Sequence, residues 1–365
     1  PPCMLPLGNR KLIQFQVENL KRFKNERIIL SLPLSYKLSV AEKRLFEYLN
    51  VEVISIPDNF SLVNALIYVI NVSDCLDSYI RILHGDTLIY DLPEDLDRIS
   101  VAHTSDEYKW KTVSSNSSDN TDLVWSGFFS FSDRQMLLKS LSLSNGNFVN
   151  AISRYKHSKE SKEIESHEWY DFGHVNTYYI SRSFITTQRS FNSLYIEDGI
   201  VYKTGLPILK IKAEGEWFKS IPPIIKKYTP QLISVGDNDL GHPFYSLEYL
   251  PYLPLNEIFV HGRNSSIFWS RQFGLFNKYF FDSRVAVDSD LTHSINEQII
   301  NDAESLYYSK TYSRLKEFDN FAILEHEVLI NGKKQLVKNI IDECISKTKK
   351  LPLIPSILHG DFCFS

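Results

Sequence analysis

The sequence predicts two domains, an α/β domain built on a mostly parallel sheet and a following α+β domain. Strand-like and helix-like segments alternate along the first half, as they do in α/β folds. From about residue 190 the order changes to a hairpin, a helix, a strand and long helical stretches. A length of 365 residues suits two domains. We place the boundary at 188/189, inside the segment 185–192.

In the first half, apolar periodicity predicts the individual elements. Residues 11–23 carry apolar side chains at helical spacing and predict a helix. Segments rich in β-branched and aliphatic residues predict three strands, at 27–32, 51–56 and 79–85. Residues 61–72 predict a helix between the last two strands, capped by Ser61 or Asn59.

The second half opens with a hairpin signal, in which two alternating apolar runs turn at Asp198-Gly199. Residues 209–221 predict a helix that stops at Pro222-Pro223. A strand that passes into an extended linker is expected at 244–255, and residues 293–318 predict long helices.

Composition excludes several classes of protein. The net charge of −4 shows no basic excess, so nucleic acid is not an expected partner. No apolar run reaches the length of a membrane span. The four cysteines are far apart and lack zinc-site spacing, which favours free thiols in a reducing cytoplasm. The chain begins abruptly on two prolines, so an upstream segment is expected.

The pentapeptide ILHGD occurs twice, at 82–86 and at 357–361. The flanking residues differ and no other similarity recurs at that separation, so two unrelated sites are favoured over an internal repeat.

The first copy places Asp86 directly after a predicted strand. The carboxyl edge of a parallel sheet is where ligands bind, and carboxylates there can hold Mg²⁺. The alternative is that Asp86 caps a turn or helix. Asp171, in an aromatic strand-like segment, is a second carboxylate that could complete a metal site beside a nucleoside triphosphate.

Four segments in order, MLPLGNRKLIQFQVENL, LHGDTLI, WSGFFSFS and WYDFGHVNTYY, resemble the sugar-phosphate nucleotidylyltransferases. The resemblance covers most of 1–185 and implies the Rossmann-like fold of nucleotide-diphospho-sugar transferases. It further implies that Asp86 and Asp171 are metal ligands. By the same resemblance, Trp125 and Gly127 line the acceptor pocket.

Two departures from that family concern phosphate binding. Its Gly-rich phosphate loop is expected upstream of Pro1, and Pro2 stands where the family has a lysine. The candidate replacement cations are Lys111, Arg182 and Arg189, although Lys111 fits a solvated lysine better than a phosphate ligand. His84 and His174, next to the carboxylates, fit packing or hydrogen-bonding roles better than that of a base.

The second copy resembles the catalytic loop of the choline kinase and aminoglycoside phosphotransferase group, with Asp361 receiving the proton of the substrate hydroxyl. That group binds Mg²⁺ through an asparagine, expected here just after Ser365. Lys203 would contact the ATP phosphates and Glu214, or less readily Glu216, would pair with it. The hinge near the adenine would carry Glu248 and Tyr249. Domain 189–365 would comprise a smaller lobe, 189–253, and part of a larger lobe, 254–365.

Together the resemblances imply a bifunctional enzyme of capsule or surface polysaccharide synthesis. A kinase domain would use ATP to phosphorylate a small alcohol or sugar. A Mg²⁺-dependent nucleotidylyltransferase would then transfer a nucleotide to it, with CTP as the favoured donor and pyrophosphate as the by-product. The alternatives are a kinase-like domain that only binds ligands, and a glycosyltransferase of the same fold, which the single carboxylate in GDTL disfavours. The sequence leaves open whether the chain forms a homo-oligomer.

Overall fold

The computed structural model describes residues 1–23, 26–74, 77–106, 112–116, 121–186, 192–286, 296–317 and 321–359. The chain divides into two compact units. The first comprises Pro1–Ser190, Leu194–Ile196 and Pro251–Gly262. The second comprises Phe191–Ser193, Glu197–Leu250 and Arg263–Ser365.

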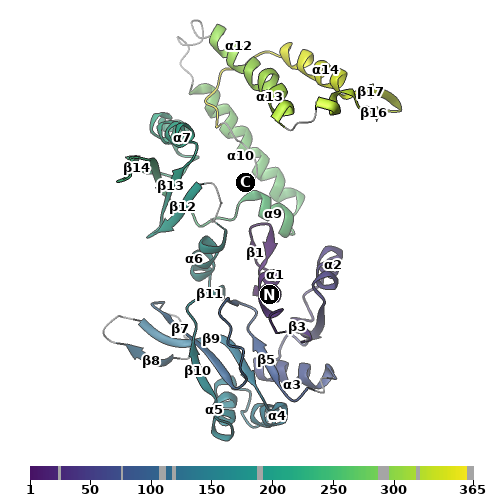
Figure 1. The fold of residues 1–365 in the computed structure, drawn as a ribbon, viewed down its shortest axis with the longest axis vertical. Helices are drawn as coiled ribbons and strands as arrows, with labels where there is room; N and C mark the ends of the chain where they lie inside the picture. The colour runs from purple at the N-terminus through teal and green to yellow at the C-terminus, as the bar shows by residue number, and fades with distance from the viewer. Residues whose placement is uncertain are drawn as a thin grey trace. The chain divides into compact units, whose positions relative to one another are not determined.

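The first unit is a mixed α/β structure (Figure 1). After a 3₁₀ turn at Pro2–Met4, its helices are α1 (Leu12–Leu20), α2 (Val40–Leu49), α3 (Leu62–Val72), α4 (Arg134–Ser142), α5 (Phe148–Ser158), α6 (Val175–Thr186) and α9 (Leu255–His261). Its strands are β1 (Pro6–Leu7), β2 (Arg10–Lys11), β3 (Ile28–Pro33), β4 (Val51–Ile56), β5 (Ile80–Leu83), β6 (Thr87–Ile89), β7 (Arg98–Thr104), β8 (Thr112–Asn116), β9 (Thr121–Phe131), β10 (Lys162–Glu165) and β11 (Trp169–Asp171).

The prediction of a mostly parallel sheet is wrong for the described residues. In the five-stranded sheet β9 pairs antiparallel with β5, β7 and β8, and only β10 and β7 run parallel. A separate parallel pair, β3 and β4, is connected through α2. β8 and β9 follow one another closely in the chain and are antiparallel neighbours, whereas the parallel pairs β3–β4 and β7–β10 are joined by long crossovers that contain helices.

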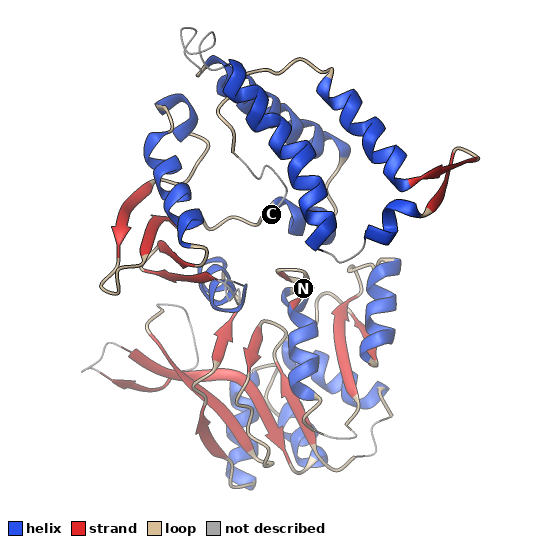
Figure 2. Ribbon diagram, turned by 45° about the horizontal axis from the view of Figure 1, so that its top comes forward, coloured by secondary structure: helices blue, strands red, loops and turns tan. Residues whose placement is uncertain are grey.

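Three helices cover one face of the five-stranded sheet (Figure 2). The core between them contains Val63 and Ile70 of α3, Leu137 and Leu141 of α4, and Ala151, Ile152 and Tyr155 of α5, packed on Ile82, Ile99, Phe129 and Phe131 of the strands. Ser61 caps α3 by accepting a hydrogen bond from the Asn64 amide, as predicted. Burial of these apolar side chains is the main force holding the helices on the sheet.

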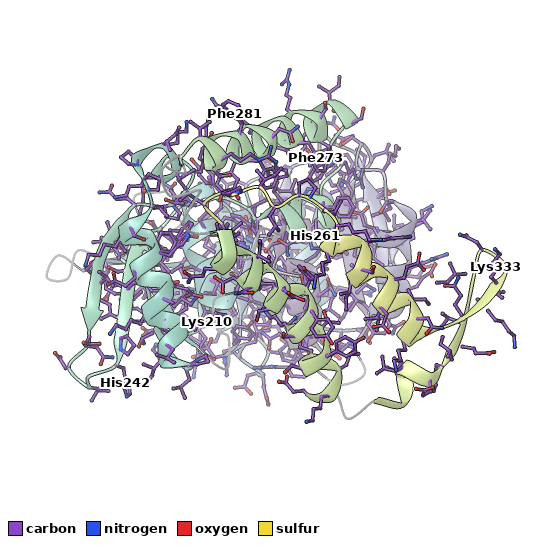
Figure 3. All side chains as sticks on the ribbon, turned by 90° about the horizontal axis from the view of Figure 1, so that it is seen from above. Lys210, His242, His261, Phe273, Phe281 and Lys333 are labelled. Carbon is purple, nitrogen blue, oxygen red and sulfur yellow. The ribbon has the colours of Figure 1, made fainter. Side chains whose placement is uncertain are left out.

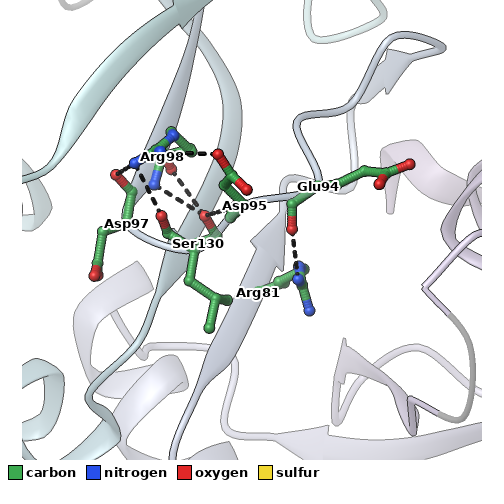
Figure 4. A network of polar contacts seen from close by, with 7 residues as sticks. Arg81, Glu94, Asp95, Asp97, Arg98 and Ser130 are labelled. Carbon is green, nitrogen blue, oxygen red and sulfur yellow. Dashed lines mark hydrogen bonds and ion pairs between the residues drawn. The ribbon is translucent and has the colours of Figure 1, made fainter.

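A polar network ties the connection before β7 to the sheet (Figure 4). The Arg98 amide donates to Ser130 Oγ at 3.0 Å, and this hydroxyl lies 3.1 Å from the Asp95 carbonyl oxygen, to which it can donate. Arg81 of β5 donates to the Glu94 carbonyl at 2.8 Å. These bonds satisfy backbone groups that would otherwise be left without partners beside the sheet.

The segment 251–262 lies beyond the predicted domain boundary in the sequence but groups with the first unit in the structure. Glu257 of α9 is 3% exposed and forms an ion pair with Arg182 of α6. The ring of His261 lies 3.3 Å from the Gly8 carbonyl oxygen. Moving α9 away would leave both charges buried without a partner, so the Arg182–Glu257 pair fixes α9 in this position. The expected lobe at 254–365 thus includes residues 254–262, which this division groups with the first unit.

The second unit has the α+β order expected from the sequence. Its strands are β12 (Asn192–Glu197), of which Leu194–Ile196 group with the first unit, β13 (Ile200–Gly205), β14 (Leu232–Asp237), β15 (Pro243–Glu248), β16 (Glu327–Ile330) and β17 (Lys333–Leu336). Its helices are α7 (Ile208–Ser220), α8 (Pro223–Lys226), α10 (Ser266–Val285), α12 (Asn296–Glu304), α13 (Lys310–Glu317) and α14 (Val337–Lys349). A π-helical turn lies at Ser305–Ser309 and a 3₁₀ turn at Phe321–Glu325.

A four-stranded sheet in the order β12-β13-β15-β14 forms the amino-terminal part of this unit. Asp198 and Gly199 both have positive φ, which is the backbone that a two-residue hairpin turn requires. Helix α10 leaves Phe273 and Phe281 exposed (Figure 3). Among the helices of the described residues, none combines the length and the apolar character needed to cross a membrane.

Candidate functional site

A tight turn after β5 positions Asp86. The Thr87 amide donates to the His84 carbonyl at 3.3 Å, which places Gly85 and Asp86 at the corners of the turn. Gln16 of α1 holds the turn in place, because its side-chain amide donates hydrogen bonds to the carbonyls of His84 and Thr87 at 3.1 and 2.7 Å. The position of Asp86 is therefore set by a buried side chain from a different element.

Gly127 of β9 allows this turn to lie against the sheet. Its carbonyl accepts a hydrogen bond from the His84 amide at 2.9 Å. A Cβ atom at Gly127 would lie 2.7 Å from Thr87 Oγ1 and 3.3 Å from the His84 Cβ. Its φ of +100° is also one that L side chains rarely adopt. Any other residue here would displace the turn that carries Asp86.

Strand pairing brings the second carboxylate to the same place. β11 pairs antiparallel with β6, with Asp171 opposite Thr87. Just beyond this pair, the Phe172 amide donates to the Asp86 carbonyl at 2.8 Å. Residues 85 positions apart in the chain are thus neighbours across a two-stranded ladder.

The two carboxylates converge beside Gly173. A Cβ atom built on Gly173 would lie 3.0 Å from Asp86 Oδ2 and 3.3 Å from Asp171 Oδ1. The absence of a side chain at Gly173 leaves a small volume that both carboxylates border. Among the described residues, no group of three or more His, Cys, Asp or Glu side chains could hold a metal ion. A cation here would have two protein carboxylates and would take its remaining ligands from water or substrate, which is usual for Mg²⁺.

Asp171 is 7% exposed, and its charge is poorly solvated. Burial raises the pKa of the Asp171 carboxyl, and the neighbouring charge of Asp86 adds to the rise. Hydrogen bonds from the Thr177 hydroxyl and the Gly173 amide oppose it. Asp171 also lies just before the amino terminus of α6, where the helix dipole favours negative charge. A divalent cation would relieve the repulsion between the two carboxylates.

Two further groups border the turn but do not supply positive charge. Burial lowers the pKa of His84, although the charge of Asp86 opposes the shift, and the ring packs on Phe129 and Phe148. Burial raises the pKa of the Cys3 thiol to about 11, so Cys3 is a neutral packing group next to Gly85. These environments suit a packing role for His84, as the sequence favoured.

The residues predicted to bind the acceptor and the phosphates lie in different surroundings. Trp125 is half-buried and its ring packs edge-on against Phe129, with centroids 5.5 Å apart. The phosphate-binding role predicted for Arg182 does not fit its position, because its guanidinium is 11% exposed and is engaged by Glu257. Lys111 and Arg189 lie outside the described residues.

In the second unit, the predicted Lys203 and Glu214 meet. Lys203 Nζ of β13 lies 2.6 Å from Glu214 Oε2 of α7. Tyr245 of β15 donates to the same carboxylate oxygen at 2.8 Å. Glu248 ends β15, and the Tyr249 amide donates to the Gly199 carbonyl at 2.8 Å.

Asp361 lies outside the described residues, as do the residues after it. The described part of that segment reaches α7, where the ring of His359 contacts Trp217 with centroids 5.8 Å apart. Trp217 also donates to the Leu358 carbonyl at 2.9 Å. Two residues before the HGD aspartate, the chain therefore lies against the helix that carries Glu214.

The sequence did not predict the roles of three residues of the first site. Gln16 occupies a buried position of α1 between apolar neighbours, and a polar residue on a buried helical face is a signal that it binds buried backbone groups. Gly173 and Thr177 follow Asp171 closely, but their roles depend on contacts with a distant turn.

Substituting Gly127 with alanine should destabilise the first unit by about 2–4 kcal/mol, because it combines backbone strain with a steric overlap at Thr87. Gly146→Ala is the matched control, since Gly146 also has a positive φ but an added Cβ would meet its nearest neighbour at 3.7 Å. Native-state hydrogen exchange of β5 and β9 measures the loss of stability in each of the two variants. Equal losses in the two variants would show that the overlap at Thr87 is unimportant.

No protein-family model matches the chain, and no curated protein matches it. Matches to two solved structures each cover about half of the chain. HddC from Yersinia pseudotuberculosis matches with 17% identity and a TM-score of 0.34, over 50% of this chain and 88% of HddC. A UDP-glucose pyrophosphorylase matches with 13% identity and a TM-score of 0.36, over 50% of this chain and 89% of that chain. These similarities are low, and we therefore draw the function from the geometry of the site.

Proposed function

We propose that the first unit is a nucleotidylyltransferase that joins a nucleoside monophosphate to a phosphorylated small alcohol or sugar, with CTP as the favoured donor. The observation that carries this proposal is the convergence of Asp86 and Asp171 beside Gly173. Asp86 and Asp171 would hold one Mg²⁺ ion, which when bound neutralises charge on the triphosphate.

The reaction joins an oxygen of the acceptor phosphate to the α-phosphorus of the nucleotide and breaks the bond between the α-phosphorus and the bridging oxygen. Pyrophosphate leaves with that oxygen, and no general base is required when the acceptor phosphate is a dianion. The residues of this chain position and orient rather than exchange protons. Gln16 and Gly127 hold the turn of Asp86, and Thr177 orients the Asp171 carboxylate by hydrogen bonding.

Pyrophosphate release tests this function directly. Each of the four nucleoside triphosphates is combined with Mg²⁺ and a panel of phosphorylated alcohols and sugars. We expect release with one nucleotide and one class of acceptor, and at least a 100-fold lower rate for Asp86→Asn. Asp58→Asn, at an exposed carboxylate bonded to Ser35, is the control and should keep full activity. Full activity of Asp86→Asn, or hydrolysis of a nucleotide-sugar in place of pyrophosphate release, would contradict the proposal.

A second candidate activity belongs to the second unit, where the Lys203–Glu214 ion pair favours an ATP-dependent phosphotransferase of the choline kinase type. In this proposal Glu214 orients the Lys203 ammonium toward the ATP phosphates, and Asp361 receives the proton of the acceptor hydroxyl. Tyr245 contributes by donating to Glu214, which keeps the carboxylate in place. The product would be the phosphorylated acceptor that the first unit uses in capsule or surface polysaccharide synthesis.

Replacing Lys203 with methionine should weaken ATP binding about 10- to 100-fold, since charge-assisted hydrogen bonds contribute about 1.5–3 kcal/mol. Thermal unfolding with increasing ATP measures the affinity. Lys210→Met is the matched control, because Lys210 also pairs with Glu214 but is exposed at the surface of α7 (Figure 3). Loss of ATP binding in both variants would indicate a nonspecific charge effect.

A further inference from the structure

A pocket of about 670 Å³ lies between α4 and α5 and shares no residue with the Asp86–Asp171 site. The two helices are neighbours on the covered face of the sheet (Figure 1). Most of the side chains that line it are exposed, so it is an open groove and not an enclosed cavity.

The pocket follows from side-chain spacing on the two helices. α4 buries Leu137 and Leu141 and α5 buries Ile152 and Tyr155 in the shared core. The residues that line the pocket recur at intervals of three and four, from Met136 to Ser144 and from Asn150 to Ser158. Within α4 and α5 this spacing puts the lining residues on one continuous face of each helix, next to the buried face. Leu143, Ser144 and Asn145 line the pocket from the connection that follows α4. The pocket is therefore walled by two ordered helices and not by loops alone.

The charged side chains that line this pocket are all basic. Lys139 of α4 and Arg154 and His157 of α5 line it, and none of the described residues lining it is acidic. Lys156 and Lys159, beside the same face of α5, instead form ion pairs with Glu163 and Asp133. Lys139 and Arg154 form no ion pair with any described residue. In a chain with a net charge of −4, this local set of unneutralised cations favours a bound anion.

The uncharged lining groups indicate what accompanies the anion. Ser153 Oγ donates to the Val149 carbonyl at 2.9 Å, and Ser144 Oγ donates to the Leu141 carbonyl at 2.7 Å. With their hydrogens engaged, these hydroxyl oxygens can still accept hydrogen bonds. The side-chain amides of Asn145 and Asn150 add both donors and acceptors. Acceptors of this kind match ligand hydroxyl groups, while the cations match phosphate.

We propose that this pocket is a second binding site, for a phosphate monoester of a polyhydroxylated compound such as a sugar phosphate. Arg154 and Lys139 bind the phosphate, and the serine and asparagine side chains bind the hydroxyl groups. His157 donates from Nδ1 to the Ser153 carbonyl at 3.1 Å, since a carbonyl can only accept, and its Nε2 is left for the ligand. Binding at this site needs no metal and does not depend on the activity of the first site.

The test uses glucose 6-phosphate as the probe and the full chain in EDTA, which removes metal-dependent binding at Asp86 and Asp171. Calorimetric titration compares the wild type with Lys139→Gln/Arg154→Gln. The matched control is Lys156→Gln/Lys159→Gln, which removes the same charge from the same region outside the pocket. All four side chains are at least partly exposed, and thermal unfolding verifies the fold of each variant. The NMR signal of the His157 ring, assigned by its loss in His157→Gln, reports the location.

We expect the pocket variant to bind at least tenfold more weakly than the wild type, the control variant to bind within twofold of it, and the His157 signal to shift during titration. Absence of binding, equal losses in the two double variants, or an unmoved His157 signal would overturn the proposal. Inorganic phosphate should bind at least tenfold more weakly than glucose 6-phosphate. Equal affinities would overturn the assignment of a polyhydroxylated ligand.

Discussion

Replacing Asp171 with asparagine should lower Mg²⁺-dependent pyrophosphate release at least 100-fold and, at the same time, stabilise the metal-free protein near neutral pH. The first effect follows because asparagine removes one of the two carboxylates that border the space beside Gly173. A 100-fold loss corresponds to about 2.7 kcal/mol of transition-state stabilisation, within what a bound cation supplies. The second effect follows from the surroundings of Asp171 in the folded protein.

The sign of the second effect is set by the pKa of Asp171, which burial raises above the ordinary value of 3.8. The folded protein therefore holds this proton more tightly than the unfolded chain does. The resulting stabilisation is complete below about pH 3.8 and is lost as the pH rises through the folded-state pKa. At neutral pH an ionised Asp171 beside Asp86 opposes folding, and asparagine removes that cost while Thr177 keeps an acceptor.

Thermal unfolding across a pH series, with EDTA or with Mg²⁺, measures both effects. In EDTA we expect Asp171→Asn to unfold at a higher temperature than the wild type near pH 7, with the difference shrinking in acid. Mg²⁺ should stabilise the wild type but not Asp171→Asn. Asp97→Asn serves as a control of opposite sign. Burial alone would raise the pKa of Asp97, but hydrogen bonds from Ser132 and Tyr155 lower it, so its loss should destabilise. If Mg²⁺ stabilised the wild type and Asp171→Asn equally, Asp171 would not be a ligand of the metal ion.

Local patterns in the sequence were sufficient to predict elements whose stability is mainly local. The helix after Ser61 and the hairpin at Asp198-Gly199 have their caps and turn residues within a few positions. The proximity of Asp86 and Asp171 is long-range, and the resemblance of ordered motifs implied it where periodicity could not. Two carboxylates that each follow a short strand do not by themselves indicate that the strands pair.

The features that the sequence did not predict all depend on pairing between distant segments. Strand direction is one of them, because similar apolar runs can pair in either direction and the connections decide. The placement of α9 is another, since it depends on Glu257 meeting Arg182 across 75 positions. The segment around Arg182 is dense in donors that suit phosphate, which predicts a phosphate ligand, yet the Arg182 guanidinium is enclosed and paired with Glu257. A cation with a buried carboxylate partner is unavailable to substrate, and only the structure identifies that partner.

Replacing Glu42 with glutamine should destabilise the first unit by about 3–5 kcal/mol, the usual cost of leaving one member of a buried ion pair without its partner. Glu42 is 5% exposed, and its carboxylate lies 2.9 Å from Lys11 Nζ, whose side chain is 12% exposed. The same carboxylate accepts hydrogen bonds from the Tyr36 hydroxyl and the Ser39 amide, both at 2.8 Å. One side chain thus joins α2, the start of α1 and the loop after β3.

The pH dependence of this contribution has the opposite sign to that of Asp171. Burial alone would raise the pKa of Glu42, but the hydrogen bonds from Lys11, Ser39 and Tyr36 lower it to about 2. The stabilisation is therefore complete above the ordinary glutamate value of 4.5 and is lost as the pH falls toward 2. The difference in unfolding free energy between the wild type and Glu42→Gln should shrink over this acid range.

Native-state hydrogen exchange of the β3–β4 pair measures the loss in this unit separately from the rest of the chain. Glu47→Gln, at an exposed position of the same helix, is the matched control and should stay within about 0.5 kcal/mol of the wild type. The double variant Lys11→Met/Glu42→Met should recover much of the stability, because apolar side chains of similar size need no partner. If that double variant were as unstable as Glu42→Gln, the unpaired lysine would not be the cause, and the lost hydrogen bonds to Ser39 and Tyr36 would account for the effect.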